Sequence, residues 1–283
     1  NAEVYTGTSR YTDAITYSSK VINAGFSLVT NYANMFMADN NATSRTEFLL
    51  TSNYDGARTQ TYGGTTYLTC ASIGGTMTPL DHGVSSAWAG LRTTSALVKL
   101  FPDVTGATDS RAMFYTSGQN LEINDLATFT DGYAVTKWSN KTSTGGRGSS
   151  TTFVDTDFPL FRLPEAYLNY AEAVLRGGTG GNTGDALTYV NAIRTRAYGD
   201  ASGNITSGQL NLQFILDERG REFYWEGYRR TDLIRYGLFT GTYVWPWKGG
   251  VAAGAAVGDF RTLYPIPATE LVANPNLKQN SGY

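Results

Sequence analysis

The chain has 283 residues, of which 16% are charged, and a formal net charge of −2. This length suffices for a full hydrophobic core in one or two domains. A nearly balanced charge without basic stripes argues against nucleic acid as a partner. No apolar run approaches the ~20 residues that a membrane helix needs, and the single cysteine, Cys70, excludes an internal disulfide.

Both helices and strands are predicted in the first half of the chain. Apolar residues at helical spacing predict an amphipathic helix over residues 9–25, and residues 47–52 form an extended run typical of a strand. Residues 54–83 are punctuated by glycines and predict a long loop, whose aromatic content favours function over disorder. The further elements expected are a helix over 86–101, which carries Trp88, short strands over 111–115 and 133–138, and a loop over 142–150.

Two helices with apolar stripes are predicted after residue 163. Pro164 suits the first turn of the former helix, where a missing N–H group costs nothing. Two antiparallel helices with small alanines at their contact are typical of a tetratricopeptide-type hairpin, although no strict repeat of ~34 residues is visible. The stripe of the latter helix consists of Ala186, Val190, Ile193 and Ala197.

The densest run of charges lies between residues 215 and 235. Glu218, Glu222 and Glu226 are spaced to stack on one helical face, where like charges repel unless cations intervene. Gly227 is expected to end this helix, because glycine adopts the left-handed conformation of a helix exit. We interpret the run as a lattice of ion pairs that fixes the helix against its neighbours, and not as an active site. The cations expected to take part are Arg219, Arg221, Arg229, Arg230 and Arg235.

Four segments of the second half resemble the SusD/RagB family, the glycan-binding surface lipoproteins of Bacteroidetes. Residues 218–237 are similar to its carboxy-terminal signature ERxREFxxEGxRxxDLIRxG, and residues 161–173 resemble its RxAExYLxxAEA helix. Residues 264–267 resemble its PIP turn, and residues 274–283 its ending, NPxLxQNxGY. The four segments follow the order of the family, and the resemblance is looser before residue 158.

The resemblance implies a mainly α, SusD-like fold. Tetratricopeptide-type helical hairpins would surround a loop-rich variable part that contains short β-strands. Residues 1–49 would belong to the helical repeats, 50–157 to the variable ligand-binding part and 158–283 to the carboxy-terminal helical part. Because the chain begins at Asn1 without methionine, we also expect a missing amino-terminal portion with a signal peptide, a lipid-modified cysteine and the first repeats.

By the same resemblance, the chain is expected to bind an oligosaccharide or polysaccharide without catalysis. It would deliver this glycan to a SusC-like TonB-dependent transporter of the outer membrane, as a step of nutrient uptake. The protein would be a surface-exposed outer-membrane lipoprotein, held to the membrane only by a lipid anchor that lies outside this chain. No cofactor and no metal ion are expected.

Two alternatives come from other classes of protein. A glycoside hydrolase needs two carboxylates ~5 to 9.5 Å apart, and the middle region offers Glu122, Asp125 and Asp131. A structural lid or a peptide-binding component of the transporter would need no sugar site. The sequence lacks the residues for nucleophilic catalysis with a histidine base, since the only histidine, His82, lies in a loop without a nucleophile motif. It also lacks a zinc site, because one histidine and one cysteine are too few ligands.

The candidate ligand-binding residues lie between residues 54 and 92. Sugar rings present apolar C–H faces edged by hydroxyls, so a protein that only binds them uses flat aromatic platforms flanked by polar side chains. Trp88 suits core and platform equally, whereas the loop tyrosines favour the platform because loops lie at the surface. The candidates are Tyr54, Tyr62, Tyr67, Asp81, Trp88 and Arg92, with Tyr115, Tyr133 and Trp138 as the second choice.

Overall fold

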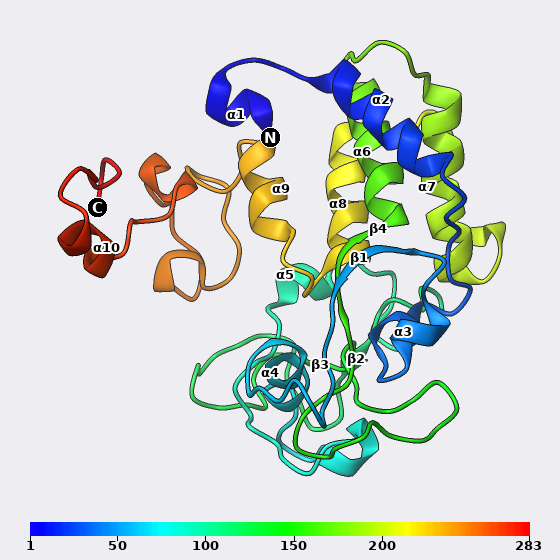
Figure 1. The fold of residues 1–283 in the computed structure, drawn as a ribbon, viewed down its shortest axis with the longest axis vertical. Coiled ribbons are helices and arrows are strands. Elements are labelled where there is room, and N and C mark those ends of the chain that lie inside the picture. Colours follow the sequence, from blue (N-terminus) through cyan, green and yellow to red (C-terminus); the bar gives the residue numbers. More distant parts are fainter. The chain divides into compact units, whose positions relative to one another are not determined.

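The computed structural model describes all 283 residues, which form two units. The larger unit comprises Ser9–Glu226, and the smaller combines Asn1–Thr8 with Gly227–Tyr283. Ten α-helices and four short strands make the chain mainly helical, as predicted (Figure 1). None of these helices combines the length and the apolar character needed to cross a bilayer. The three functional parts predicted from the sequence, 1–49, 50–157 and 158–283, remain a proposal.

Helix α6 (Leu163–Leu175) is central to the helical layer of the larger unit. It packs against α2 (Tyr11–Ile22), α7 (Thr183–Tyr198) and α8 (Leu212–Phe223) (Figure 1). The helices α6 and α7 form the predicted hairpin, and the stripe from Ala186 to Ala197 is buried. Asparagine side chains cap α7 and α8, where they accept hydrogen bonds from amides of the first turn.

Strand pairing joins the two ends of the middle region. Strand β1 (Phe48–Ser52) pairs antiparallel with β4 (Phe158–Arg162), so the chain enters and leaves residues 53–157 at one place. Strand β2 (Phe114–Tyr115) pairs with β3 (Ala134–Val135) inside that region. The predicted strands are therefore present, but β2 and β3 are shorter than predicted. The short helices of this unit are η1 (Tyr32–Phe36), α3 (Asn40–Thr43), α4 (Gly64–Cys70), η2 (Pro79–His82), α5 (Ser95–Val98) and η3 (Ala201–Gly203).

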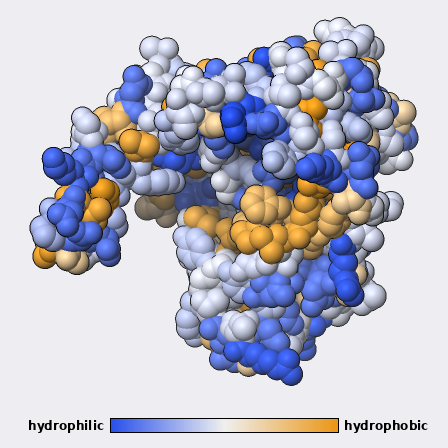
Figure 2. Space-filling view, turned by 45° about the horizontal axis from the view of Figure 1, so that its top comes forward, coloured by the Kyte–Doolittle hydropathy of each residue, from blue (hydrophilic) through white to orange (hydrophobic).

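Large apolar side chains of the β1–β4 sheet are exposed. Leu50 and Phe161 are partners in the register, and both are about half exposed. Leu160 beside them is also exposed. Figure 2 shows apolar residues gathered in a band on one face of the molecule. Exposed apolar clusters of this kind often mark contact surfaces.

The predicted helix over residues 86–101 is wrong, and so is the predicted plain loop over 54–83. Only α5 is helical in the former segment, and α4 and η2 lie in the latter. Trp88 belongs to a loop because its backbone is held by hydrogen bonds to the end of α4 rather than by helical ones. Periodicity of apolar residues could not reveal this, since the bonds join segments distant in sequence.

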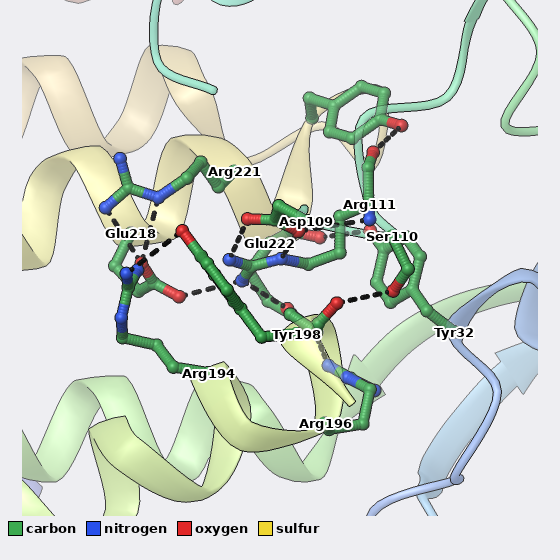
Figure 3. A network of polar contacts seen from close by, with 12 residues as sticks. Tyr32, Asp109, Ser110, Arg111, Arg194, Arg196, Tyr198, Glu218, Arg221 and Glu222 are labelled. Atoms are coloured by element: carbon green, nitrogen blue, oxygen red, sulfur yellow. Dashed lines mark hydrogen bonds and ion pairs between the residues drawn. The ribbon is translucent and has the colours of Figure 1, made fainter. Parts of the chain in front are cut away.

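Helix α8 carries buried charges, which confirms the predicted lattice of ion pairs. Glu218 and Glu222 are fully buried, and Arg111 lies between them with nitrogen-to-oxygen distances of 2.7 and 3.0 Å (Figure 3). Glu226 follows the end of the helix and pairs with Arg162 at 2.8 Å. Of the five cations proposed, Arg221 pairs with Glu218 at 2.8 Å. The lattice also contains cations from other segments that were not predicted, namely Arg111, Lys137, Arg162, Arg194 and Arg196.

The smaller unit consists of short helices and loops. Its helices are α1 (Ala2–Thr6), α9 (Arg229–Arg235), η4 (Lys248–Gly250), η5 (Asp259–Thr262) and α10 (Ala268–Ala273). Gly227 has a positive φ of 85°, as a chain reversal requires, but it lies beyond α8, whose last residue is Phe223. Gln279 joins the end of the chain to the PIP turn, because its side-chain amide bonds to both backbone groups of Ile266, at 2.8 and 2.9 Å.

Candidate functional site

Three of the predicted ligand-binding residues come together in an aromatic cluster. The ring of Trp88 lies 6.1 Å from that of Tyr62 and 6.2 Å from that of Tyr67, measured between ring centres. Phe153 extends the cluster, with its ring 5.0 Å from that of Tyr62. Tyr62 and Tyr67 are 64% and 45% exposed, so the cluster lies at the surface. We call these four residues the aromatic platform.

The end of α4 holds Trp88 in place. The N–H group of Trp88 donates to the Cys70 carbonyl at 2.9 Å, and those of Gly90 and Leu91 donate to the Ala71 carbonyl at 2.9 and 2.7 Å. These carbonyls lie at or just beyond the helix end, where they lack partners within the helix. Ala89 donates to Ile73 and adopts a positive φ of 50°, which is strained for a residue with a Cβ atom.

A second tether brings Phe153 to the platform. The N–H group of Val154 donates to the side-chain oxygen of Thr66 on α4, at 3.0 Å. Val154 is buried in the same apolar cluster as Cys70, and Trp88 packs against that cluster with part of its surface. One part of the Trp88 side chain therefore packs on the core and another part lies at the surface, so Trp88 combines the core and platform roles predicted for it. Phe153 was missed from the sequence, where its place after a Gly/Ser/Thr tract gave no signal.

The other three predicted residues do not belong to the platform. Arg92 donates to the backbone carbonyls of Asp125, Leu126 and Asp131, at 2.5 to 3.2 Å, so its guanidinium holds a loop. Tyr54 is partly buried, and its ring lies against Gly64 at the start of α4.

Asp81 lies at a different cavity of the larger unit. This cavity measures about 340 Å³, and none of the platform rings lines it. His82 lines the same cavity, and burial lowers the pKa of its imidazole, against the effect of the neighbouring Asp81.

The acids of the middle region serve the loop that contains them. Glu122 accepts from Ser95 at 2.7 Å and from Lys99 at 2.9 Å, and Asp125 accepts from the amide of Ala127. Asp131 accepts from the side chain of Asn120 and from two backbone amides. These hydrogen bonds lower the pKa of all three carboxyls. A glycosidase needs one carboxyl with a raised pKa as general acid, so the three acids are poorly suited to that reaction.

The charged lattice on α8 is structural and not a reaction centre. Burial alone would raise the pKa of Glu218, but the guanidinium groups of Arg111, Arg221 and Arg194 outweigh it and lower the pKa to about 2. Each oxygen of Glu218 is taken up by at least one of these arginines (Figure 3). A carboxylate satisfied in this way neither attacks a substrate nor exchanges protons near neutral pH. The chain holds no group of three or more His, Cys, Asp and Glu residues arranged for a metal ion.

Comparison with known proteins identifies the class of protein to which this fold and this surface belong. The sequence matches the SusD family over residues 104–283, and the chain belongs to that family. The predicted SusD/RagB assignment is thereby confirmed. The relative SusD is named as a starch-binding protein, which supports the prediction that the chain is not an enzyme.

Two individual relatives are similar to this chain in sequence. The starch-binding protein SusD of Bacteroides thetaiotaomicron is 35% identical over an alignment 329 positions long, which covers all of this chain and 58% of that protein. SusD-like protein P2 of Formosa agariphila is 32% identical over 188 residues, or 63% of this chain and 35% of that one. The chain thus spans little more than half the length of its full-length relative SusD.

Solved structures share the fold. Surface glycan-binding protein A from Bacteroides fluxus superimposes with a TM-score of 0.73 at 20% identity, over 100% of this chain and 60% of that one. The protein of the same name from Bacteroides thetaiotaomicron, in complex with laminarihexaose, gives 0.70 at 23% identity, over 99% and 61%. The predicted SusD-like fold is confirmed.

Proposed function

We propose that this chain binds a glycan on the aromatic platform and does not cleave it. The observation that carries the proposal is the juxtaposition of two exposed tyrosines with Trp88 on a rigid support. The names of two relatives support it, since one is a starch-binding protein and the other was solved with laminarihexaose. The residues proposed to contact the glycan are Tyr62, Tyr67, Trp88 and Phe153.

The angles between the rings favour a curved glycan. The planes of Tyr62 and Tyr67 are each tilted by 51° from that of Trp88, and Phe153 is tilted by 54° from Tyr62. A flat, ribbon-like chain cannot lie face to face on rings that are inclined to one another. A chain that bends along its length presents a new sugar face to each ring, so we expect a helical or curved glucan to bind better than a flat one.

Affinity is expected to be modest and to grow with the length of the glycan. Stacking removes apolar surface from water and gains roughly 25 cal/mol per Å². Lost freedom of motion and desolvated hydroxyls offset much of that gain. One ring therefore contributes little, and several rings must act on one chain, which gives dissociation constants from about micromolar to millimolar.

Beyond glycan binding, we propose a role in carbohydrate transport at the cell surface. We propose that the whole protein is an outer-membrane lipoprotein that passes its glycan to a SusC-like TonB-dependent transporter. Family membership supports this, and the exposed apolar side chains of the β1–β4 sheet are of the kind that protein partners cover. A lid or peptide-binding role would use the same transporter without the platform.

The first prediction tests the platform with a matched pair of variants. Tyr62→Ala removes one platform ring and should weaken binding about two- to tenfold, because an aromatic stacking contact is worth ~0.5 to 1.5 kcal/mol. Tyr17→Ala on α2 removes a tyrosine that is equally exposed, at 64%, but lies outside the platform, and should leave affinity unchanged. Calorimetric titration with maltoheptaose, laminarihexaose and cellohexaose measures both effects.

Several outcomes would count against this function. Equal affinity of the flat cellohexaose and the two curved glucans would remove the argument from ring angles. Release of shorter sugars during the titration, detected by chromatography, would indicate a glycosidase. Binding of none of the glycans, or an equal loss in both tyrosine variants, would leave the lid or peptide-binding alternative.

A further inference from the structure

A second aromatic cavity lies within the smaller unit. It measures about 730 Å³, which is within the usual range of small-ligand pockets, and residues 239–261 supply its whole lining. Four aromatic side chains form its walls. They are Phe239, Trp245, Trp247 and Phe260.

The loop that forms this cavity is well ordered by its own hydrogen bonds. The amide of Gly241 donates to the Val257 carbonyl at 3.1 Å, and that of Ala255 donates to the Lys248 carbonyl at 2.9 Å. The ammonium group of Lys248 is buried under the loop, donates to the Tyr243 carbonyl and lies 4.7 Å from the centre of the Trp245 ring. The cavity therefore exists before any ligand binds.

Backbone strain is concentrated at one of the walls. Trp247 has a positive φ of 68°, which only two other non-glycine residues of the chain share, Ala89 and Trp225. A bulky residue adopts this conformation only where its surroundings enforce it, and such strain is found preferentially at ligand-binding sites. Ala89 adjoins the platform residue Trp88, so a strained residue accompanies a tryptophan at both aromatic surfaces.

The polar groups of the cavity are donors, and its lining contains no carboxylate. Arg261 is exposed, its guanidinium forms no hydrogen bond or ion pair, and it lies 5.1 Å from the Phe260 ring. The amides of two further lining residues, Ala256 and Gly258, donate no hydrogen bond within the chain. An anionic group placed beside Arg261 would give its guanidinium a partner.

We propose that this cavity is a second saccharide site, and that it takes a sugar residue bearing a carboxylate or a sulfate. The aromatic walls suit the apolar face of a pyranose ring, and the planar fork of Arg261 suits a two-oxygen anion. The site uses none of the platform residues, so it does not depend on the function proposed for them.

The experiment measures binding of three trisaccharides to the full chain by calorimetry. The probes are trigalacturonate, a sulfated galactotriose and neutral maltotriose. We expect one or both anionic probes to bind, the neutral probe to show no binding that depends on Arg261, and added salt to weaken the anionic complex. The tighter of the two anionic probes identifies the source of the charge.

Matched variants decide whether Arg261 is responsible. Arg261→Gln should weaken the anionic probe at least tenfold, whereas Arg10→Gln, at another exposed arginine, should leave it unchanged. Tyr62→Ala should weaken glucan binding and leave the anionic probe unaffected, which separates failure of this site from failure of the platform. Absence of anionic binding, equal losses in both arginine variants, or equal affinity for tetraglutamate would overturn the proposal.

Discussion

Three arginines converge on the buried carboxylate of Glu222. Arg111 lies 3.0 Å from one of its oxygens, Arg196 lies 2.5 Å from the other, and Arg162 bonds to it as well. Burial alone would raise the pKa of Glu222, but the arginines outweigh burial and hold it well below its usual range. The carboxylate is therefore ionised at any pH near neutrality, and it compensates charges supplied by three separate segments.

Removing this one charge should destabilise the larger unit strongly. Glu222→Gln keeps the shape of the side chain but leaves buried guanidinium groups without their counter-charge, which costs about 3–5 kcal/mol. Urea denaturation followed by circular dichroism measures the loss. Asp217→Asn on the same helix is the control, because Asp217 bonds only to the exposed Gln213, and its loss should stay below ~0.5 kcal/mol. Equal effects of the two variants would show that the lattice contributes little.

At the scale of elements, the loop from Trp88 to Leu91 acts as a cap on α4. Its four amides bond to carbonyls of Cys70, Ala71 and Ile73, so the position of Trp88 follows from the position of that helix end. Gly74 permits the close approach of this loop. A Cβ atom at residue 74 would lie 2.6 Å from the Phe129 ring and 2.8 Å from the Cβ atom of Ala89, which is closer than real structures allow.

Substitutions at two glycines, one beside this loop and one within it, test whether the cap positions Trp88. Gly74→Ala should displace Ala89 and with it Trp88, so that glycan affinity falls more than for Tyr62→Ala, with some loss of stability. Gly90→Ala adds a methyl group 3.8 Å from Ala71, an ordinary contact, and should preserve affinity. Titration with maltoheptaose measures affinity and thermal unfolding monitors the fold. Unchanged binding by Gly74→Ala would mean that the platform does not depend on this loop.

At the scale of the whole chain, the patterns of neighbouring residues predicted those features of the fold that depend on neighbouring residues. Apolar stripes at helical spacing located α2, α6 and α7, and the acidic row located α8 and its ion pairs. Loop aromatics located two tyrosines of the platform. These features depend on residues within a few turns of one another, which a single sequence displays directly.

The parts that were missed depend on contacts between distant segments. The helix expected around Trp88 does not form, because the amides of that loop bond to α4 instead. Arg111 and Arg162, which bear most of the ion lattice, stand far from α8 in the sequence and have no spacing relation to it. Arg92 has the chemistry of a ligand-binding residue, and only the structure shows that a loop already occupies its guanidinium.

The lattice also predicts how the larger unit responds to acid. The pKa of Glu218 is about 2 in the folded chain and 4.5 in the unfolded reference, so the stability it contributes is complete above pH 4.5 and is lost as the pH falls toward 2. The difference corresponds to roughly 3 kcal/mol for this residue. Glu222 acts in the same direction, whereas Glu47, whose pKa burial raises, acts in the opposite one.

Glu122, Asp125 and Asp131 also have a lowered pKa, so the free energy of unfolding should decline from pH 4.5 to pH 2. Urea denaturation at half-unit steps of pH measures this slope. In Glu218→Gln the titrating carboxyl is absent, so the chain should be less stable at pH 7 and its stability should depend less steeply on pH below 4.5. A slope equal to that of the unmodified chain would show that other carboxyls govern acid unfolding.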